Sequence, residues 1–354
     1  MRPMRTAVRL QQRVMRAATR LPVPILRTIA GGDVVVDGEL LDPQLAAVLR
    51  LARRMGPRLE TMPPARARRA AEVGMAAFDA DLVPMARIFE ETAPGPAGDL
   101  PVRVYVPKFA SGGLVVYFHG GGGVIGSIDG HDRFCRMYAE HSNCAVASVH
   151  YRLGPEDRHP AAIDDAVAVW PWALLRAHRW GCDPARVAVG GDSFGGYLAA
   201  WVELAARDRA HDGRLRSGIM PRPRAQVLIY PLVDLTMSQP SAERYADGFL
   251  LTRDLTRWFR SHYADEAQWR AGSPMFIPDL GTAATTLIVA AGFDPIRDDG
   301  VRYAERLRAT GTAVDYRVHT SLIHGFITMT GACDAARAAV IDLARATAAV
   351  LRSA

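Results

Sequence analysis

Short, strongly apolar runs alternate with helix-patterned stretches over the last two thirds of the chain. The apolar runs lie at residues 102–106, 114–119, 144–151, 186–191, 226–230, 286–292 and 313–318. Between and after them, helical patterns occupy residues 130–142, 160–180, 193–208, 300–311 and 332–352. Strands this apolar must be buried on both faces. The alternation therefore predicts an α/β fold, with a mostly parallel central sheet and helices on both faces.

Two segments depart from this alternation. Residues 1–90 are helix-patterned and poor in strands, and a segment rich in Pro and Gly follows at 91–101. Residues 232–280 separate two strands by far more chain than a crossover needs, and loops of that length are usually functional. Ligands of open α/β sheets bind at the carboxyl ends of the strands. We expect a helical cap at these strand ends, formed by the helical segment and linker at residues 1–90 and by residues 232–280. The core is then made of residues 91–231 and 281–354.

The stretch VVYFHGGGGVIGS at residues 115–127 allows two incompatible interpretations. Gly121, Gly123 and Gly126 fit the pattern G-x-G-x-x-G behind an apolar run, which is typical of a dinucleotide-binding turn. Read from His119, the same residues spell H-G-G-G, the pattern of an oxyanion loop in lipase-like hydrolases.

The dinucleotide interpretation fails at the next apolar run. It requires an acidic residue about 20 positions on, at the tip of the next strand, to hold a ribose. That position is occupied by His150 and Tyr151, with Arg152 after them, and no Gly-Lys-Ser/Thr follows the glycines. We therefore interpret the stretch as an oxyanion loop, because glycines let bare backbone N–H groups approach a developing negative charge. Gly121 and Gly122 are the predicted donors.

The pentapeptide GDSFG places a serine where an apolar run ends and a helix begins. In that context G-x-S-x-G is a nucleophile elbow, since only small residues two positions before and after the serine avoid collision in so sharp a turn. Gly191 and Gly195 are those residues. Ser193 is the predicted nucleophile, and the backbone N–H of Phe194 is the third predicted oxyanion donor. Taken alone, the pentapeptide is also compatible with a glycine-rich turn that carries an incidental serine.

A base and an acid follow the serine in the order Ser, acid, His that is typical of such hydrolases. A serine hydroxyl needs a base within hydrogen-bond reach, and a carboxylate must hold that base in place. Asp294 directly follows an apolar run, and His324 lies on a loop before the last helix. Asp298 and Asp299 resemble first-turn helix residues, which serve the helix dipole, and His319 ends a strand. We therefore predict Asp294 and His324 as the catalytic acid and base.

Charge and cysteine content narrow the choice of partners and compartment. The net charge is +6, but Lys108 is the only lysine among the 43 Lys and Arg residues. This preference for arginine is typical of proteins encoded by GC-rich genomes, and is weak evidence for a surface that binds nucleic acid. We expect no nucleic-acid partner. The four cysteines lack C-x-x-C spacing, which argues against a zinc site or a disulfide framework. A reducing, cytoplasmic location is the simplest interpretation. No apolar run reaches the ~18 residues that a membrane span requires.

The first 32 residues contain seven arginines and no acidic residue. A transit peptide or a membrane-surface helix has such a composition. The alternative is a cap helix whose apolar residues pack on the body of the protein: Val8, Val14, Met15, Ala18 and Leu21. Arginines interrupt every apolar stretch, so no signal-peptide core is present. We expect no stable membrane insertion. A weak contact of the Arg-rich N-terminal helix with a membrane surface is left as an alternative.

Seven ordered motifs carry a family resemblance over roughly residues 100–330. They are HGGGG (119–123), YRLGPE (151–156) with HPAAIDD (159–165), GDSFGG (191–196), YPLVDL (230–235), ADGFLLT (246–252), DPIRDDG (294–300) and LIHGF (322–326). In these motifs the chain resembles the hormone-sensitive-lipase-like group of the α/β-hydrolase fold, in particular the bacterial GDSAG carboxylesterases. The resemblance implies a nucleophile, an acid and a base at Ser193, Asp294 and His324, and oxyanion donors at Gly121, Gly122 and Phe194. It also implies a cap, no cofactor and no metal, and hydrolysis of short- to medium-chain acyl esters.

The chain departs from the pattern of this group at two positions. Phe194 and Gly154 stand where the group usually has alanine. We expect the Phe194 ring to crowd or line the pocket, and we expect little from Gly154. Four further polar residues are interpreted as structural, the first three as a network beneath the site: Arg152, Glu156, Asp164 and Asp192.

The sequence predicts a cofactor-independent serine carboxylesterase that works on a small-molecule ester through an acyl-enzyme. An amidase or another acyl hydrolase is an alternative, because fold and triad do not fix the leaving group. A non-catalytic small-molecule receptor is a second alternative, although receptors that resemble this group lack the histidine found here at position 324. A membrane-surface or nucleic-acid-binding function rests on the N-terminal arginines alone. A homodimer is left open.

Overall fold

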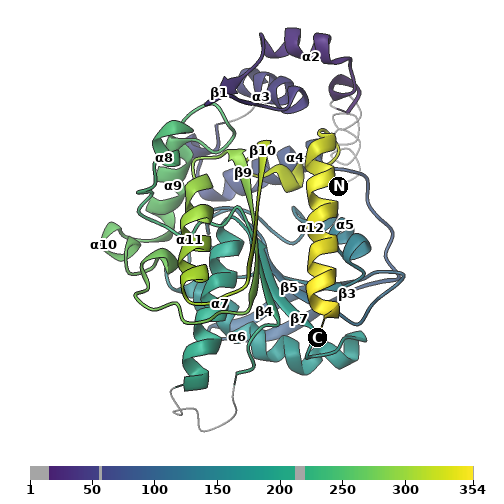
Figure 1. Ribbon diagram of the computed structural model, residues 1–354, viewed down its shortest axis with the longest axis vertical. Coiled ribbons are helices and arrows are strands. Elements are labelled where there is room, and N and C mark those ends of the chain that lie inside the picture. Colours follow the sequence, from purple (N-terminus) through teal and green to yellow (C-terminus); the bar gives the residue numbers. More distant parts are fainter. Residues whose placement is uncertain (1–15, 56–57, 212–219, 354) are drawn as a thin grey trace.

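An eight-stranded sheet forms the centre of the computed structural model, which describes residues 16–55, 58–211 and 220–353 (Figure 1). The strand order is β10-β9-β8-β7-β5-β6-β4-β3. Strands β5 to β10 pair in parallel, whereas β3 and β4 are antiparallel at one edge. The strands are β3 (Arg87–Gly95), β4 (Gly98–Val106), β5 (Leu114–Phe118), β6 (Ala145–Val149), β7 (Val187–Asp192), β8 (Ala225–Ile229), β9 (Thr285–Phe293) and β10 (Val314–Ile323). The predicted mostly parallel α/β architecture is confirmed.

Helices cover both faces of the sheet because its central strands are mainly apolar. Every residue of β5, β6, β7 and β8 is buried. One face packs against α6 (Ala161–Arg176), α7 (Phe194–His211) and α11 (Arg297–Ala309). The other face packs against α5 (Asp132–Ser142) and α12 (Asp334–Arg352). Figure 1 shows α12 and α5 on one side of the strands and α11 and α7 on the other.

The strand β3 was not predicted. Residues 91–101 were interpreted only as a Pro- and Gly-rich segment at the start of the core, but they belong to a hairpin in which Arg87 pairs with Val106 and Gly95 with Gly98. Only Ala93 of the nine residues of β3 is buried, because β3 is the edge strand of the sheet. An edge strand tolerates proline and needs little apolar character, so its pattern is weak. A two-stranded ladder, β1 (Val35–Val36) with β2 (Glu39–Leu40), also lies in the segment expected to be poor in strands.

Parts of the N-terminal segment and of the 232–280 insertion lie together at one end of the molecule. The helices of the first are α2 (Val23–Ala30), α3 (Pro43–Met55), η1 (Leu59–Thr61) and α4 (Pro64–Phe78). Those of the second are α8 (Ser241–Arg244), α9 (Arg253–Tyr263), α10 (Glu266–Trp269) and η3 (Pro274–Phe276). Figure 1 shows α2, α3, α8 and α9 at this end. Ion pairs Arg244–Asp37 and Arg58–Asp254 join the two segments, and Asp42 N donates to Ser321 O in β10 (3.0 Å).

The Arg-rich start of the chain is only partly described. Val8, Val14 and Met15 lie outside the described residues. Ala18 is half-buried, but Leu21 is exposed, contrary to expectation. It precedes α2, whose only buried residue is Leu26. Across the described residues, no helix is long and apolar enough to cross a membrane.

Candidate active site

Ser193 sits on a strained turn between β7 and α7. Its φ angle is +54°, which L-residues rarely adopt. The turn is pressed against β5, because a Cβ at Gly195 would lie 1.9 Å from Phe118 O and one at Gly191 would lie 2.3 Å from Gly195 C. Neither position can hold a side chain. Ser193 N donates to Ile229 O at the end of β8 (2.8 Å), which ties the turn to the sheet.

The structure brings the three predicted catalytic side chains into one hydrogen-bonded line. With its proton on Nδ1, His324 donates to Asp294 Oδ2 (2.8 Å) and accepts the Ser193 hydroxyl at Nε2 (2.9 Å). Asp294 follows β9 and His324 follows β10, so adjacent parallel strands end at the same edge of the sheet. Asp294 is fully buried and also accepts from Ile296 N (2.9 Å). This line can pass a proton from the serine hydroxyl to an oriented imidazole.

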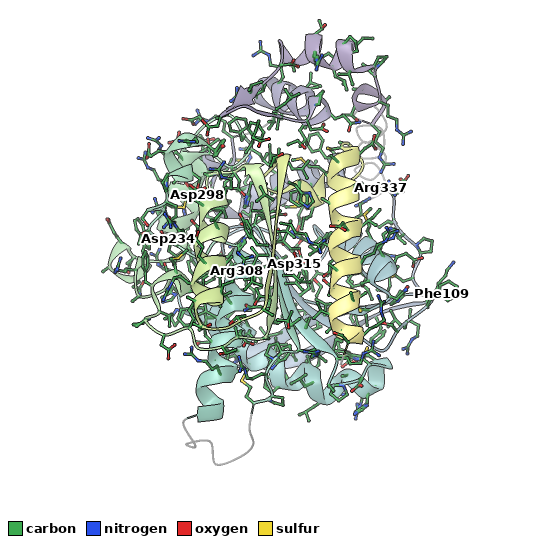
Figure 2. The ribbon with its side chains drawn as sticks, viewed as in Figure 1. Phe109, Asp234, Asp298, Arg308, Asp315 and Arg337 are labelled. Atoms are coloured by element: carbon green, nitrogen blue, oxygen red, sulfur yellow. The ribbon has the colours of Figure 1, made fainter. Side chains whose placement is uncertain are left out.

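The competing residues bond elsewhere. Asp298 and Asp299 are in the first turn of α11, as expected. Asp298, labelled in Figure 2, accepts from Ser241 N (3.0 Å) in α8 of the insertion. Asp299 accepts from the backbone N–H of Asp234 (3.1 Å), and burial raises the pKa of Asp299. The His319 ring packs edge-on against Phe326.

Tyr230 is a site residue that the sequence analysis missed. Its ring centroid lies 4.6 Å from that of His324 and 5.2 Å from that of Phe326. Its φ angle is +33°, and it directly follows β8. The packed ring restricts the imidazole to the orientation in which it reaches Ser193. The positive φ cannot be seen in a sequence, so only its place in the motif YPLVDL pointed to it.

The predicted oxyanion loop has a backbone that only glycine accommodates. Gly121 and Gly122 have φ angles of +121° and +61°. A Cβ at Gly121 would lie 2.2 Å from Ile125 O, and the N–H groups of Val124 and Ile125 both donate to Gly121 O (3.0 and 2.9 Å). Among the described residues, no acceptor is found for the backbone N–H of Gly121, Gly122 or Phe194. These three donors are free to bind an oxygen atom.

Asp192 joins the turn that carries Ser193 to the oxyanion loop. Its carboxylate accepts from Gly120 N (2.7 Å) and from the hydroxyl of Tyr117, and it lies 3.6 Å from His131 Nε2. Burial alone would raise the pKa of Asp192, but the charge and hydrogen bond of His131 hold it below its usual value. The same pairing raises the pKa of His131 against the effect of its own burial. Tyr117 and His131 were not singled out from the sequence.

His119 is buried beneath the same loop as a neutral ring. Burial, and then the positive charge of His131, lower its pKa to about 3. Its Nδ1 donates to Gly120 O (2.8 Å), and its ring stacks on Tyr151 with centroids 4.5 Å apart. The histidine that opens the HGGGG motif therefore supports the loop and has no contact with Ser193 among the hydrogen bonds of the site.

The expected network of Arg152, Glu156 and Asp164 is wrong in its partners. Arg152 pairs with Asp165 (2.7 Å), whose side chain is fully buried, whereas Asp164 is exposed. Neighbouring positions on a helix point about 100° apart, so only one of the two adjacent acids in α6 faces inward. Glu156 pairs instead with Arg68 of α4 (2.6 Å).

The two positions that depart from the family pattern are both filled closely. The Phe194 ring has no exposed surface and packs against Tyr151, Tyr197 and Tyr263. It therefore belongs to an aromatic cluster, and does not lie on an open pocket wall. At Gly154 a Cβ would lie 2.5 Å from His262 O, so the expectation that this glycine matters little is wrong.

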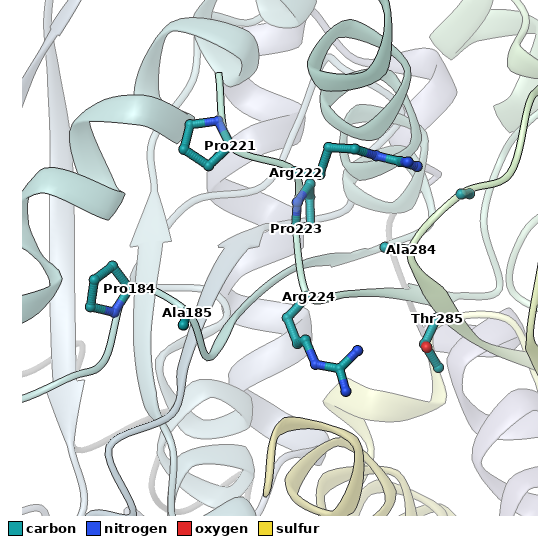
Figure 3. A pocket seen from close by; sticks show the side chains of 9 residues that line it. Pro184, Ala185, Pro221, Arg222, Pro223, Arg224, Ala284 and Thr285 are labelled. Atoms are coloured by element: carbon teal, nitrogen blue, oxygen red, sulfur yellow. The ribbon is translucent and has the colours of Figure 1, made fainter. Parts of the chain in front are cut away.

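A separate pocket, drawn in Figure 3, lies at the amino ends of β7, β8 and β9, opposite the strand ends that carry Ser193, Asp294 and His324. Pro184, Arg222, Arg224 and Thr285 line it, together with neighbouring residues, and none of the predicted site residues is among them. In the part of the chain that the structure describes, no group of three His, Cys, Asp or Glu side chains is arranged to hold a metal ion.

Comparisons with known proteins agree with this arrangement. A family model described as the alpha/beta hydrolase fold matches residues 115–328. Carboxylic ester hydrolase LipN of Mycobacterium tuberculosis is 40% identical over 87% of this chain and 83% of its own length. Ethyl acetate hydrolase of Pseudomonas putida is 39% identical over 65% of this chain and 72% of its own length. Among solved structures, a hyperthermophilic esterase from the archaeon Pyrobaculum calidifontis has a TM-score of 0.79 at 34% identity, and the match covers 87% of this chain and 98% of that one.

The family match spans more than half of the chain and includes the turn at Ser193, the oxyanion loop, Asp294 and His324. The strand order, the strained serine and the glycine-only loop are features of the same fold. The chain therefore belongs to the α/β-hydrolase family, in its hormone-sensitive-lipase-like group.

Proposed function

We propose that this chain hydrolyses carboxylic esters by acyl transfer through Ser193. The enzyme class follows from the family, whose relatives here are named as ester hydrolases. One observation carries the mechanism: Ser193 Oγ, His324 and Asp294 form a continuous hydrogen-bonded line with separations of 2.9 and 2.8 Å.

In the first half of the reaction, Ser193 Oγ attacks the ester carbonyl carbon while His324 Nε2 takes the hydroxyl proton. The carbonyl oxygen becomes an oxyanion, which accepts from the N–H groups of Gly121, Gly122 and Phe194. One such donor is typically worth about 10²–10³ in kcat. Asp294, fully buried, keeps the proton on Nδ1 of His324 and stabilises the imidazolium that forms.

In the second half, His324 returns its proton to the leaving alkoxide, and the alcohol departs from an acyl-enzyme. Water then attacks the acyl carbon while His324 again acts as the base. Collapse of the second tetrahedral intermediate releases the carboxylic acid and restores the Ser193 hydroxyl. His324 can serve both leaving group and water because its Nε2 is the one ring nitrogen that faces the serine.

The substrate is proposed to be a small ester with a short- to medium-length acyl chain, bound under a cap made by residues 1–90 and 232–280. The relative named ethyl acetate hydrolase supports a short acyl group. The ion pairs that join the two segments support a shared cap. We also propose a cytoplasmic location, which the four free and buried cysteines support. We propose no nucleic-acid partner.

The test is hydrolysis of p-nitrophenyl esters from acetate to palmitate, with pre-steady-state measurement of the first turnover. The wild type is expected to prefer short chains and to release a burst of p-nitrophenol equal to the enzyme concentration. Ser193→Ala and His324→Ala should lose nearly all activity, whereas His319→Ala, at the competing histidine, should retain it. A Ser193→Ala variant that keeps its rate would disprove the mechanism.

A further inference from the structure

Helix α9 of the insertion presses two aromatic side chains onto the oxyanion loop. Phe259 and Tyr263 are four residues apart and so share one face of the helix. A Cβ at Gly122 would lie 2.3 Å from Phe259 Cγ, and one at Gly123 would lie 2.9 Å from Tyr263 Cδ2. The two glycines are thus in direct contact with α9. Neither position has room for a side chain beneath the helix.

Phe194 supports the same loop from a second direction. A Cβ at Gly123 would lie 2.8 Å from Phe194 Cζ, so this glycine is held by the Phe194 and Tyr263 rings together. The two rings meet edge to face, with centroids 4.7 Å apart and planes at 81°. Such an edge-to-face contact stabilises the pair beyond the effect of the area it buries. Both side chains are almost completely buried.

Gly154 lets the end of α9 come this close. A Cβ at Gly154 would lie 2.5 Å from His262 O and 3.3 Å from Tyr263 Cα. The φ angle of Gly154 is not positive, so its backbone suits alanine and only the space forbids it. Gly154 N also donates to Gly123 O (2.7 Å). The glycine therefore contacts both α9 and the loop that α9 holds.

Polar contacts fix Tyr263 in this place. Its carbonyl oxygen accepts from His159 N (2.8 Å). Its hydroxyl lies 3.3 Å from the Tyr197 hydroxyl and 3.3 Å from His159 Nδ1. Arg158 donates to Ser261 O (2.8 Å) and forms an ion pair with Asp265, two residues after the last residue of α9. The carboxyl end of α9 is thus joined to the core segment around residues 154–159.

We propose that Tyr263 is a positioning residue of the oxyanion hole: seated on Phe194 and admitted by Gly154, it holds Gly123, and through it the neighbouring donor Gly122, in the catalytic conformation. Backbone donors stabilise an oxyanion only if they are already oriented when the charge develops. A run of glycines with positive φ has no side chains of its own to hold it. The insertion then acts in catalysis through α9, as a fixed part of the site. This inference deepens the proposed function and rests on it.

The experiment compares Tyr263→Leu, Tyr263→Phe and Phe194→Ala with the wild type on p-nitrophenyl acetate. Tyr263→Leu and Phe194→Ala are expected to lower kcat about tenfold, less than the loss of a whole donor, and to change KM less than twofold. Tyr263→Phe, which keeps the ring, should recover most of kcat. Arg257→Ala, on the exposed face of the same helix, is the matched control and should leave kcat unchanged. Thermal unfolding of each variant establishes that it is folded.

A trifluoromethyl ketone inhibitor separates positioning from simple loss of packing. Its adduct with the serine places a negatively charged oxygen in the oxyanion hole. The inhibition constant should therefore rise by the same factor by which kcat/KM falls in Tyr263→Leu. An inhibition constant that stays at the wild-type value, or a variant that changes KM alone, would overturn the proposal and leave α9 as a wall of the pocket.

Gly154→Ala tests the route from the core to α9. Its Cβ should displace Tyr263 and lower kcat in the wild-type background. In Phe194→Ala the ring has space to move, so the same substitution should cost at least threefold less, a non-additivity expected of groups in contact. Additive effects would contradict the coupling. If Ser193→Ala is inactive and these variants are normal, this inference fails alone; if Ser193→Ala keeps its rate, the proposed function fails first.

Discussion

At the scale of single residues, Asp192 joins two parts of the site that must stay in register. It precedes the serine in the chain, and its carboxylate holds the oxyanion loop through Gly120 N. A Cβ at Gly120 would lie 2.4 Å from Asp192 Oδ2, so the loop comes as close to the carboxylate as backbone can. The pairing with His131 supplies the opposite charge that a buried carboxylate needs. Asp192 is therefore structural, as expected, but it acts directly on the catalytic loop.

Asp192→Asn is expected to impair both activity and stability. The amide oxygen can still accept from Gly120 N and the Tyr117 hydroxyl, but the amide cannot balance the charge of His131, and its NH2 group replaces the oxygen that lies against Gly120. We expect kcat/KM to fall about 10- to 100-fold through a displaced loop, and the free energy of unfolding to fall by about 3 kcal/mol. Steady-state kinetics and urea unfolding measure the two effects. Asp164→Asn, at an exposed acid, is the control, and wild-type kinetics in Asp192→Asn would refute the assigned role.

At the scale of elements, the end of α4 places a carboxyl group in the protein interior. Asp79 follows α4 and is 1% exposed. It accepts from Thr330 Oγ1 (2.7 Å) and Ala80 N (2.9 Å). Burial nevertheless raises its pKa to about 6, against an ordinary value of 3.8. The native state thus favours the protonated form of Asp79, and the ionised form costs stability.

This shift predicts a pH-dependent difference between the wild type and Asp79→Asn. Between about pH 4 and 6 the native state binds a proton at Asp79 that the unfolded state releases, so wild-type stability falls as pH rises through that window. Two pKa units correspond to about 3 kcal/mol. Asparagine stays neutral, so the variant should be the more stable protein at pH 7.5 and lose that advantage near pH 4. Urea unfolding across this range measures it, and a difference independent of pH would contradict the assignment.

At the scale of the whole molecule, segments far apart in the chain hold the oxyanion loop from two directions. Helix α9 contacts it at Gly122 and Gly123, as described above. From the N-terminal segment, Arg68 of α4 donates to Val124 O and Gly154 O, both at 2.8 Å. The same guanidinium pairs with Glu156. The loop therefore depends on residues that lie outside the matched region as well as on the core.

Arg68→Met should destabilise the protein more than the loss of an ordinary surface ion pair. Methionine keeps the apolar stem but leaves two carbonyl oxygens without their donor, which typically costs about 1–3 kcal/mol each when they are buried. Arg302→Met, in the exposed pair with Glu305 on α11, is the control and should change stability by less than about 1 kcal/mol. Chemical unfolding compares the two variants. Equal effects would mean that the N-terminal segment does not brace the loop.

The sequence predicted the features that depend on local pattern. The central strands appear as apolar runs because both of their faces are buried, and the turn at Ser193 appears as two glycines because its backbone excludes side chains. The edge strand β3 was missed because only one of its residues is buried. The prediction that Asp164 belongs to a buried network was wrong, because only the packing of α6 decides which of its two adjacent acids faces inward.

By itself, then, the sequence determined the α/β class, the order of Ser193, Asp294 and His324 along the chain, and the glycines of the predicted oxyanion loop. Each of these reflects a demand of the local backbone or of burial. Only the tertiary structure decided what surrounds them. Tyr263 lies more than 130 residues from Gly123, and Tyr117 lies 75 residues from Asp192. Such contacts arise when distant segments pack against the same strand ends, and no spacing within one segment records them.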